Sequence, residues 1–268
     1  MTRIALGVEY DGSAYSGWQT QQAGVATVQS RVEAALARVA DHPVSVICAG
    51  RTDRGVHATG QVIHMDSDAV RDEKAWVHGA NANLPDDIAI RWARPVDDSF
   101  HARFRAHSRC YRYVILNHPV RPALFRRQVT WNYRPLDVAL MAQAAEHLVG
   151  THDFTSYRGI QCQAKSPVKT LHRLDVTRQQ QYLVIEAEAN AFLMHMVRNI
   201  AGVLMAIGAG KAAPDWAAEV LAARDRTRGG VTAPPFGLYL VHIGYPGEYG
   251  LPDEPLGPFW LPGTRLTR

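Results

Sequence analysis

The sequence is poor in the features that mark several common protein classes. It has 3 cysteines in 268 residues, and none lies in a C-x-x-C pair, which argues against a disulfide framework and a thiolate zinc site. We therefore expect three reduced thiols. The longest apolar stretch, residues 200–210, is interrupted by glycines and is shorter than the roughly 20 residues that a membrane span requires. No membrane association is expected.

Signals for export and for common ligands are also missing. The first ten residues, MTRIALGVEY, lack a basic segment followed by an apolar run and a cleavage site, so we expect a cytoplasmic location. The sequence has no G-x-x-x-x-G-K-[ST], strand-coupled G-x-G-x-x-G, H-E-x-x-H or G-x-S-x-G motif, which disfavours ATP-dependent, nicotinamide-dependent and common hydrolase functions. The 12 histidines lack helical ligand spacing, so no metal site is expected.

Positive charge is concentrated in one part of the chain. Residues 99–136 contain no Asp or Glu and carry eight arginines: Arg103, Arg105, Arg109, Arg112, Arg121, Arg126, Arg127 and Arg134. Aromatic side chains, among them Phe104, Tyr111 and Trp131, interleave with them. Guanidinium groups and flat rings together suit phosphates and exposed bases, so this stretch predicts a polyanion ligand, with single-stranded or loop RNA as a plausible one. The alternative is a solvated face in an arginine-rich protein.

Apolar periodicity predicts the order βαββαβ, and predicts it twice. In the first half we expect strands at 3–10, 44–50, 61–65 and 88–93, and helices at 28–39, capped by Thr27, and at 71–80. In the second half we expect strands at 110–116, 171–177, 182–189 and 238–243, and helices at 136–148, with Pro135 near its first turn, at 193–208 and at 215–223.

This repeated order predicts an α/β (α+β) fold built from two ferredoxin-like βαββαβ subdomains. We expect mostly antiparallel sheets that abut and leave a central catalytic cleft. The predicted subdomains are residues 1–105, which hold the candidate catalytic loop, and residues 106–245. Residues 246–268 are rich in proline and glycine and are expected to form an extended tail that is dispensable for chemistry.

One loop places a carboxylate between two guanidinium groups. Residues 49–58 read A-G-R-T-D-R-G-V-H-A, and Asp53 lies between Arg51 and Arg54. Nearby positive charge favours the ionised carboxylate, so Asp53 would act as a nucleophile or a base. The alternative is an aspartate that caps a turn, and local composition alone favours that alternative.

This loop resembles the catalytic A-G-R-T-D-x-G-V-H-A signature of the tRNA pseudouridine synthase A family. Three further segments resemble the same family: Y-D-G at 10–12 with G-W-Q-x-Q at 17–21, R-C-Y-R-Y at 109–113, and N-A-F at 190–192 through M-V-R-N at 196–199. The resemblance extends from residue 3 to about residue 245.

The resemblance implies a cofactor-free homodimer that isomerises uridine to pseudouridine at positions 38, 39 and 40 of the tRNA anticodon stem-loop. DNA is not an expected partner. Asp53 would be the catalytic carboxylate, with Arg198 beside it and Arg51 supporting the extruded nucleotide. Tyr111 would stack on the target uracil, and Arg109 and Arg112 would bind the substrate. The alternatives are surface phosphate contact for Arg51 and Arg198 and a core position for the tyrosine, which describes Tyr113 better.

Two questions stay open on sequence alone. Asp53 can attack the ribose anomeric carbon, act at uracil C6, or act as a base in glycal formation. The chain can also be a non-catalytic RNA-binding module, because βαββαβ units occur in RNA-recognition domains and the basic stretch needs no Asp53. An RNA nuclease or phosphotransferase is disfavoured, because neither clustered carboxylates nor a histidine pair can be assembled from the spacing.

Overall fold

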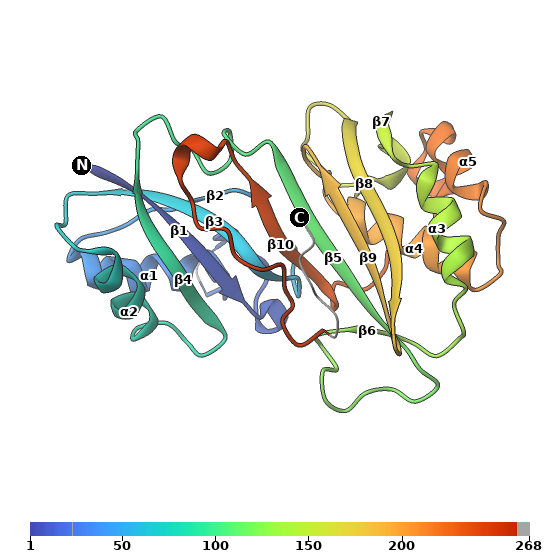
Figure 1. The fold of residues 1–268 in the computed structure, drawn as a ribbon, viewed down its shortest axis with the longest axis horizontal. Helices are drawn as coiled ribbons and strands as arrows, with labels where there is room; N and C mark the ends of the chain where they lie inside the picture. Colours follow the sequence, from blue (N-terminus) through green and yellow to red (C-terminus); the bar gives the residue numbers. More distant parts are fainter. Residues whose placement is uncertain (23, 262–268) are drawn as a thin grey trace. The chain divides into compact units, whose positions relative to one another are not determined.

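The computed structural model describes residues 1–22 and 24–261 and separates into two compact units (Figure 1). Unit 1 comprises Met1–His107 and the chain from Tyr239 onward, and unit 2 comprises Ser108–Leu238. Each unit combines helices with a mostly antiparallel sheet. The predicted mixed α/β class is therefore confirmed.

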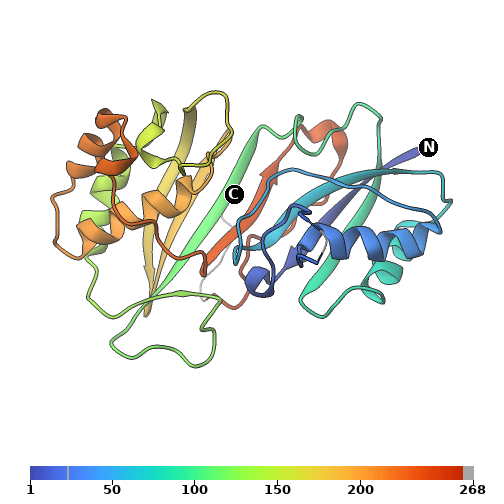
Figure 2. The same cartoon turned by 180° about the vertical axis from the view of Figure 1, so that it is seen from behind.

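The sheet of unit 1 has the strand order β4-β1-β3, and β2 and β10 both pair with the other edge of β3. Its elements are β1 (Thr2–Tyr10), α1 (Val28–Ala40), β2 (Ile47–Cys48), β3 (His57–Ser67), α2 (Glu73–Asn81), β4 (Ile88–Val96) and β10 (Leu238–Gly244). The β1–β3 and β1–β4 pairs are antiparallel, and β10 runs parallel to β3. Figure 2 shows α1 and α2 in front of the strands of this unit.

Helix α1 illustrates how the sequence specifies these elements. The Thr27 hydroxyl accepts a hydrogen bond from the Ser30 N–H, which satisfies one of the free amides of the first turn. Val28, Val32 and Leu36 are completely buried, and burial of such a side chain contributes about 1.5–3 kcal/mol. The helix ends at Ala40, and the next residue, Asp41, is the C-cap, with a left-handed φ of 59°.

The sheet of unit 2 has the strand order β5-β9-β8-β7, with antiparallel neighbours, and the short strand β6 runs parallel to β5. Helix α3 packs against β8, and α4 packs against β5. The elements are β5 (Ser108–Asn117), β6 (Thr130–Asn132), α3 (Val138–Glu146), β7 (Gly150–Asp153), β8 (Val168–Gln179), β9 (Tyr182–Ala189), α4 (Met196–Gly208) and α5 (Trp216–Ala223).

The predicted strand 44–50 is wrong in extent, because only Ile47–Cys48 is a strand. On either side, backbone groups bond to side chains: Val46 N–H donates to Glu33 Oε1 at 3.0 Å, and Gly50 bonds to Gln61. The predicted helix 136–148 begins later, after Asp137, whose carboxylate accepts from two first-turn amides. Pro135 therefore lies outside the helix. Strands β6 and β7 were not predicted.

The described part of the predicted tail packs against unit 1. Gly257 approaches Thr59 so closely that a Cβ atom would lie 2.4 Å from Thr59 Oγ1. Leu261 is buried, and the Arg91 guanidinium lies 5.6 Å from the centre of the Phe259 ring. Residues 246–261 thus contribute to the packing of unit 1, and residues 262–268 lie outside the described residues.

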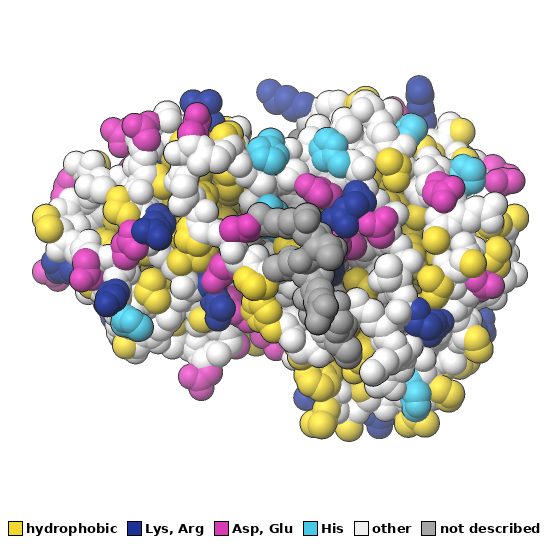
Figure 3. Space-filling view, viewed as in Figure 1, with side chains coloured by type: hydrophobic (Ala, Val, Ile, Leu, Met, Phe, Trp, Pro, Cys, Tyr) yellow, Lys and Arg dark blue, Asp and Glu magenta, His cyan; other side chains and the backbone are white. Residues whose placement is uncertain are grey.

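No helix among residues 1–22 and 24–261 is both long enough and apolar enough to cross a membrane. All three cysteines are free, and Cys48 and Cys110 are buried. Figure 3 shows acidic and basic side chains interspersed over unit 1 on the face drawn, whereas apolar side chains gather over the loop that leads to β6. That loop belongs to the basic stretch and exposes Val120, Leu124 and Phe125.

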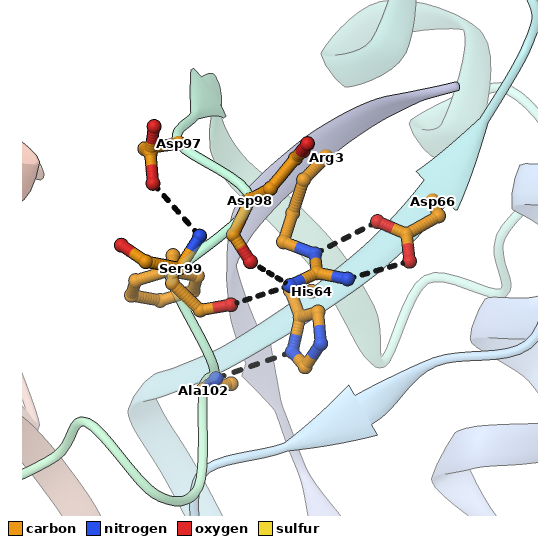
Figure 4. Close-up of polar contacts among 8 residues, drawn as sticks. Arg3, His64, Asp66, Asp97, Asp98, Ser99 and Ala102 are labelled. Atoms are coloured by element: carbon orange, nitrogen blue, oxygen red, sulfur yellow. Dashed lines mark hydrogen bonds and ion pairs between the residues drawn. The ribbon is translucent and has the colours of Figure 1, made fainter.

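A polar cluster on β1 and β3 fixes the segment that follows β4 (Figure 4). Arg3 binds both carboxylate oxygens of Asp66 at 2.8 Å and donates to the carbonyls of Asp98 and Phe100. Beside it, the buried His64 ring accepts a hydrogen bond at Nδ1 from the Ala102 N–H, at 3.2 Å. The chain after β4 is therefore attached to the sheet at several points.

This cluster predicts that the protein loses stability in mild acid. Burial, and then the positive charges of His101 and Arg3, lower the pKa of His64 from 6.5 to about 4, against a smaller opposing effect of Asp66. Between those two pH values the unfolded chain binds a proton at His64 and the folded chain does not, so stability falls as the pH falls. We expect the free energy of unfolding to decrease by up to about 3 kcal/mol across this range.

Urea unfolding at pH 7.5, 5.5 and 4.5 measures this effect. In the variant His64→Asn the amide oxygen can replace Nδ1 as acceptor and does not titrate, so its stability should change less over the same range. Equal pH dependence in both proteins would contradict the assignment to His64. Asp66 affects stability in a different pH range. The hydrogen bond from Arg3 lowers the pKa of Asp66, so its contribution to stability is lost only at a pH below the ordinary pKa range of a carboxylate.

Candidate functional site

Asp53 lies in the loop of residues 49–56 that connects β2 to β3. Its side chain is partly exposed, and the flanking Arg51 and Arg54 are exposed. The Val56 N–H donates to the Asp53 carbonyl at 3.1 Å, and Gly55 supplies the positive φ of 78° that the turn requires. The loop therefore holds a partly exposed carboxylate that is flanked in the sequence by two exposed arginines, and a role for these arginines beside it stays a prediction.

A buried amide holds the start of this loop. Gln61 on β3 is completely buried, and its side chain donates to the Gly50 carbonyl at 2.6 Å and accepts from the Gly50 N–H at 3.3 Å. One residue earlier, the Ala49 N–H still donates to the Val62 carbonyl at 2.8 Å. The side chain of Gln61 thus takes the place of a neighbouring strand and lets the chain leave the sheet without unsatisfied backbone groups.

The opening segment of the chain holds the middle of the loop. The hydroxyl groups of Tyr10 and Thr52 are hydrogen-bonded at 2.7 Å in a buried position, and the Trp18 N–H donates to the Thr52 carbonyl at 3.0 Å. Trp18 is itself 1% exposed. Both bonds end on Thr52, directly before Asp53, so the position of the carboxylate is linked to the core of unit 1.

Two glycines permit this close approach. Gly17 has a φ of 96°, and a Cβ atom there would lie 2.7 Å from the Thr52 carbonyl oxygen. At Gly12 a Cβ atom would lie 1.9 Å from the Val56 carbonyl oxygen. The Y-D-G and G-W-Q motifs are thus the parts of the chain that brace the Asp53 loop. The amino-acid composition of these two motifs does not indicate that they contact the Asp53 loop.

The predicted stacking residue, Tyr111, lies on β5 in unit 2. It is 8% exposed, and the centre of its ring lies 5.1 Å from that of Phe192 in an edge-to-face arrangement. Tyr113 is completely buried, and its hydroxyl bonds to Thr130 at 2.6 Å and to the Pro234 carbonyl at 2.9 Å. Tyr113 is therefore a core residue, as expected.

The two arginines of the R-C-Y-R-Y motif have partners within unit 2. Arg109 donates to the Asn190 carbonyl at 2.9 Å. Arg112 is nearly buried and pairs with Glu186 on β9, with Nε and Oε2 2.6 Å apart, and Glu186 also binds Arg173 at 2.5 Å. The register that places Arg112 opposite Glu186 was not predicted. Phosphate contact by Arg109 and Arg112 stays a prediction.

Arg198 lies in the first turn of α4, where the chain fastens a long loop to the helix. Its Nε donates to the Ala233 carbonyl at 2.8 Å, and the Ala233 N–H donates to the Arg198 carbonyl at 3.1 Å. The next residue, the buried Asn199, accepts from Arg226 at 3.0 Å and from Thr232 at 2.6 Å. The M-V-R-N motif thus positions residues 226–233.

The predicted site residues fall into two groups. Arg51 and Asp53 share the loop in unit 1, whereas Arg109, Tyr111, Arg112 and Arg198 belong to unit 2. Convergence of the two groups in one cleft stays a prediction. Within the described ranges, no group of three or more His, Cys, Asp or Glu side chains is arranged to hold a metal ion. The loop of residues 49–56 offers one partly exposed carboxylate, that of Asp53.

Comparison with known proteins identifies what the chain resembles. A family model described as "tRNA pseudouridine synthase" matches residues 7–105 and 144–246. A protein of Alcanivorax borkumensis named "tRNA pseudouridine synthase A" is 67% identical over 262 residues, which cover 98% of each chain. Proteins of the same name from Pseudomonas aeruginosa and Coxiella burnetii are 60% and 57% identical, over 98% of this chain and 92% and 100% of theirs.

Proposed function

The chain belongs to the tRNA pseudouridine synthase A family, and from this premise we propose that it converts uridine to pseudouridine at positions 38, 39 and 40 of the tRNA anticodon stem-loop. It is an isomerase that acts on tRNA. The observation that carries the proposal is the Asp53 loop, in which a partly exposed carboxylate follows the doubly anchored Thr52.

The chemistry matches a site with one carboxylate. The N1–C1′ bond of uridine breaks and a C5–C1′ bond forms, while C5 loses a proton and N1 gains one, so no atoms are added or removed overall. No redox partner and no phosphoryl donor takes part. Asp53 is the group that acts on the target nucleoside, whether by attack at ribose C1′, by attack at uracil C6, or as the base in glycal formation.

The other predicted residues have supporting roles in this proposal. Arg51 supports the extruded nucleotide from the same loop, and Arg198 orients the carboxylate as its ion-pair partner. Tyr111 stacks on the uracil, because a ring face tolerates a base that must turn over. Arg109 and Arg112 bind the RNA, and Arg112 does so while paired with Glu186.

The construction of the loop favours an enzyme over a non-catalytic RNA-binding module. A buried glutamine, a buried tyrosine–threonine bond and a glycine at a φ of 96° all act on the few residues around Asp53. Binding of an RNA backbone needs cationic groups and does not need a fixed, partly exposed carboxylate. Catalysis does need one, held in a defined orientation.

Transcripts labelled with tritium at uridine C5 test the proposal. We expect release of the label to water from a transcript with uridine at positions 38, 39 and 40, and none from a transcript in which cytidine replaces those uridines. Because the proposed chemistry uses no metal, release should persist when EDTA is added and spermidine maintains the tRNA fold. Equal release from both transcripts would contradict the position assignment, and inhibition by EDTA under these conditions would contradict the metal-free mechanism.

We further infer from the family that the enzyme is a homodimer in the cytoplasm. Its substrate is tRNA, the molecule named for its relatives in three bacteria.

A further inference from the structure

The turn of residues 101–105 exposes a large aromatic side chain beside arginines. Phe104 is 74% exposed, and the Arg103 guanidinium lies 5.6 Å from the centre of its ring. The His101 ring stacks on Phe104 at 4.3 Å with an interplanar angle of 29°. Arg105 is also exposed, and residues 99–107 contain no acidic side chain. The turn therefore combines positive charge with a flat apolar surface.

The backbone of this turn is fixed by its own hydrogen bonds. The N–H groups of Arg103 and Phe104 both donate to His101 Nδ1 at 3.2 Å, and the Arg105 N–H donates to the His101 carbonyl at 3.0 Å. Arg105 Nε donates to the Ser99 carbonyl at 3.0 Å. A mobile surface loop would not be held in this way, so the exposed position of Phe104 is specified by the structure.

The sheet of unit 1 holds the same turn from below. In Figure 4, His64 on β3 points toward Ala102, whose N–H it binds, and the Ala102 carbonyl accepts from the Tyr245 hydroxyl at 2.6 Å. Phe100 is completely buried, with Tyr245 and Tyr249 in ring contact. The turn is thus a rigid platform that carries an exposed ring.

The platform lies beside the strand that leads to Asp53. The rings of His101 and His64 are 4.8 Å apart, and His64 is the register partner of Ile47 on β2. The next residue, Cys48, provides a second link. Burial raises the pKa of the Cys48 thiol to about 11, and the positive charges of Arg51 and Arg103 oppose that rise. The guanidinium groups of the loop and of the turn therefore act on the same side chain.

We propose that the turn of residues 101–105 is an RNA-binding element of unit 1, in which Phe104 packs against an unstacked base and Arg103 binds a neighbouring phosphate of the same strand. The inference rests on the proposed function and names a part of unit 1, outside the loop of residues 49–56, that binds the substrate. Aromatic stacking together with a nearby cation is the general means by which proteins bind single-stranded nucleic acid, and a rigid platform loses little entropy on binding.

Removal of the Phe104 ring tests the stacking contact. In Phe104→Ala we expect the KM for tRNA to rise about tenfold, within the range measured for loss of one stacked base, while kcat changes by less than about twofold. Phe104→Trp should restore the wild-type KM, because it keeps a stacking surface. Arg103→Gln should weaken tRNA binding and reduce the slope of log Kd against log salt by about 0.7 to 0.9, the value for one phosphate contact.

Val70→Ala and Arg71→Gln are the matched controls, because they remove another highly exposed apolar side chain and another exposed arginine of unit 1. Arg71 lies beside α1, where its Nε donates to the Val39 carbonyl. Both controls should keep the wild-type KM and salt slope. Thermal unfolding of all four variants and of Phe104→Trp should match the wild type, because the replaced side chains are exposed.

Several results would overturn the proposal. An unchanged KM in Phe104→Ala, a loss of kcat at constant KM, or a failure of Phe104→Trp to restore KM would each exclude stacking. A change in sedimentation behaviour of Phe104→Ala without RNA would assign the turn to contact between copies of the chain. The proposed function is tested separately by tritium release from the wild-type enzyme, so its failure is distinguishable from failure of the turn alone.

Discussion

Replacement of Asp53 by asparagine is expected to stop pseudouridine formation while tRNA binding persists. The amide has nearly the same shape and keeps the loop in place, but it carries no negative charge and can neither act as a nucleophile nor take up a proton. We expect the rate of tritium release to fall by at least about a thousandfold, as is typical when a group that takes part directly in bond breaking is removed. The Kd for tRNA, measured by filter binding, should change by less than about threefold.

The exposed Asp86 offers a matched control for this substitution. It lies in a turn of the same unit, and Asp86→Asn makes the same chemical change outside the loop of residues 49–56. That variant should release tritium at the wild-type rate. Full release by Asp53→Asn would exclude the catalytic role, and loss of tRNA binding by Asp53→Asn would show that the carboxylate acts in binding.

A methyl group added at Gly17 is expected to reduce both activity and stability, although Gly17 itself carries no chemistry. The new Cβ would lie 2.7 Å from the Thr52 carbonyl oxygen and 3.2 Å from the carbonyl carbon of Asp53, so the loop must move. The φ of 96° is also unfavourable for alanine. We expect unfolding to become easier by about 2–4 kcal/mol, because overpacking adds to backbone strain. We expect kcat to fall about a hundredfold, because displacement of a catalytic group by about 1 Å has that effect.

The substitution Gly24→Ala separates the effect of backbone strain from the effect of overpacking. Gly24 has a similar φ of 88°, but no atom lies within 4 Å of the position that a Cβ would take. Gly24→Ala should therefore lose only about 1–2 kcal/mol of stability, the conformational part, and keep its kcat. Urea unfolding and single-turnover kinetics on both variants measure the difference. If Gly17→Ala kept the wild-type kcat, the contact between the opening segment and the loop would not position Asp53.

Local sequence patterns were sufficient to predict the elements whose backbone hydrogen bonds stay within the element or run to an adjacent strand. Helix α1 begins at the predicted residue because Thr27 caps it from the neighbouring turn, and β9 matches its predicted range of 182–189. Local patterns failed for β2, which is short because Glu33 and Gln61 replace a strand partner. Nothing within residues 44–50 indicates that a distant side chain will bond to their backbone.

The same distinction between local patterns and contacts from distant residues applies to the candidate site. The presence of Asp53 between two arginines is visible in ten consecutive residues, and family resemblance was needed to prefer chemistry over a simple turn. The groups that brace the loop come from positions as far apart as Tyr10 and Gln61, so no local pattern reveals them. The one available signal is Gln61 itself, a polar residue on the same face of β3 as the buried Ile63 and Met65.

The division of the chain into units also governs the order in which it can fold as it leaves the ribosome. Unit 2 is one continuous segment, whereas unit 1 needs both Met1–His107 and the chain from Tyr239 onward. Nascent chains generally complete their N-terminal domains first. One edge of β3 pairs with β1, which is among the first residues translated. The other edge pairs with β10 and lacks this partner until the last part of the chain is made. A nonsense mutation that removes β10 would therefore leave incomplete the sheet that contains the first strand of the protein.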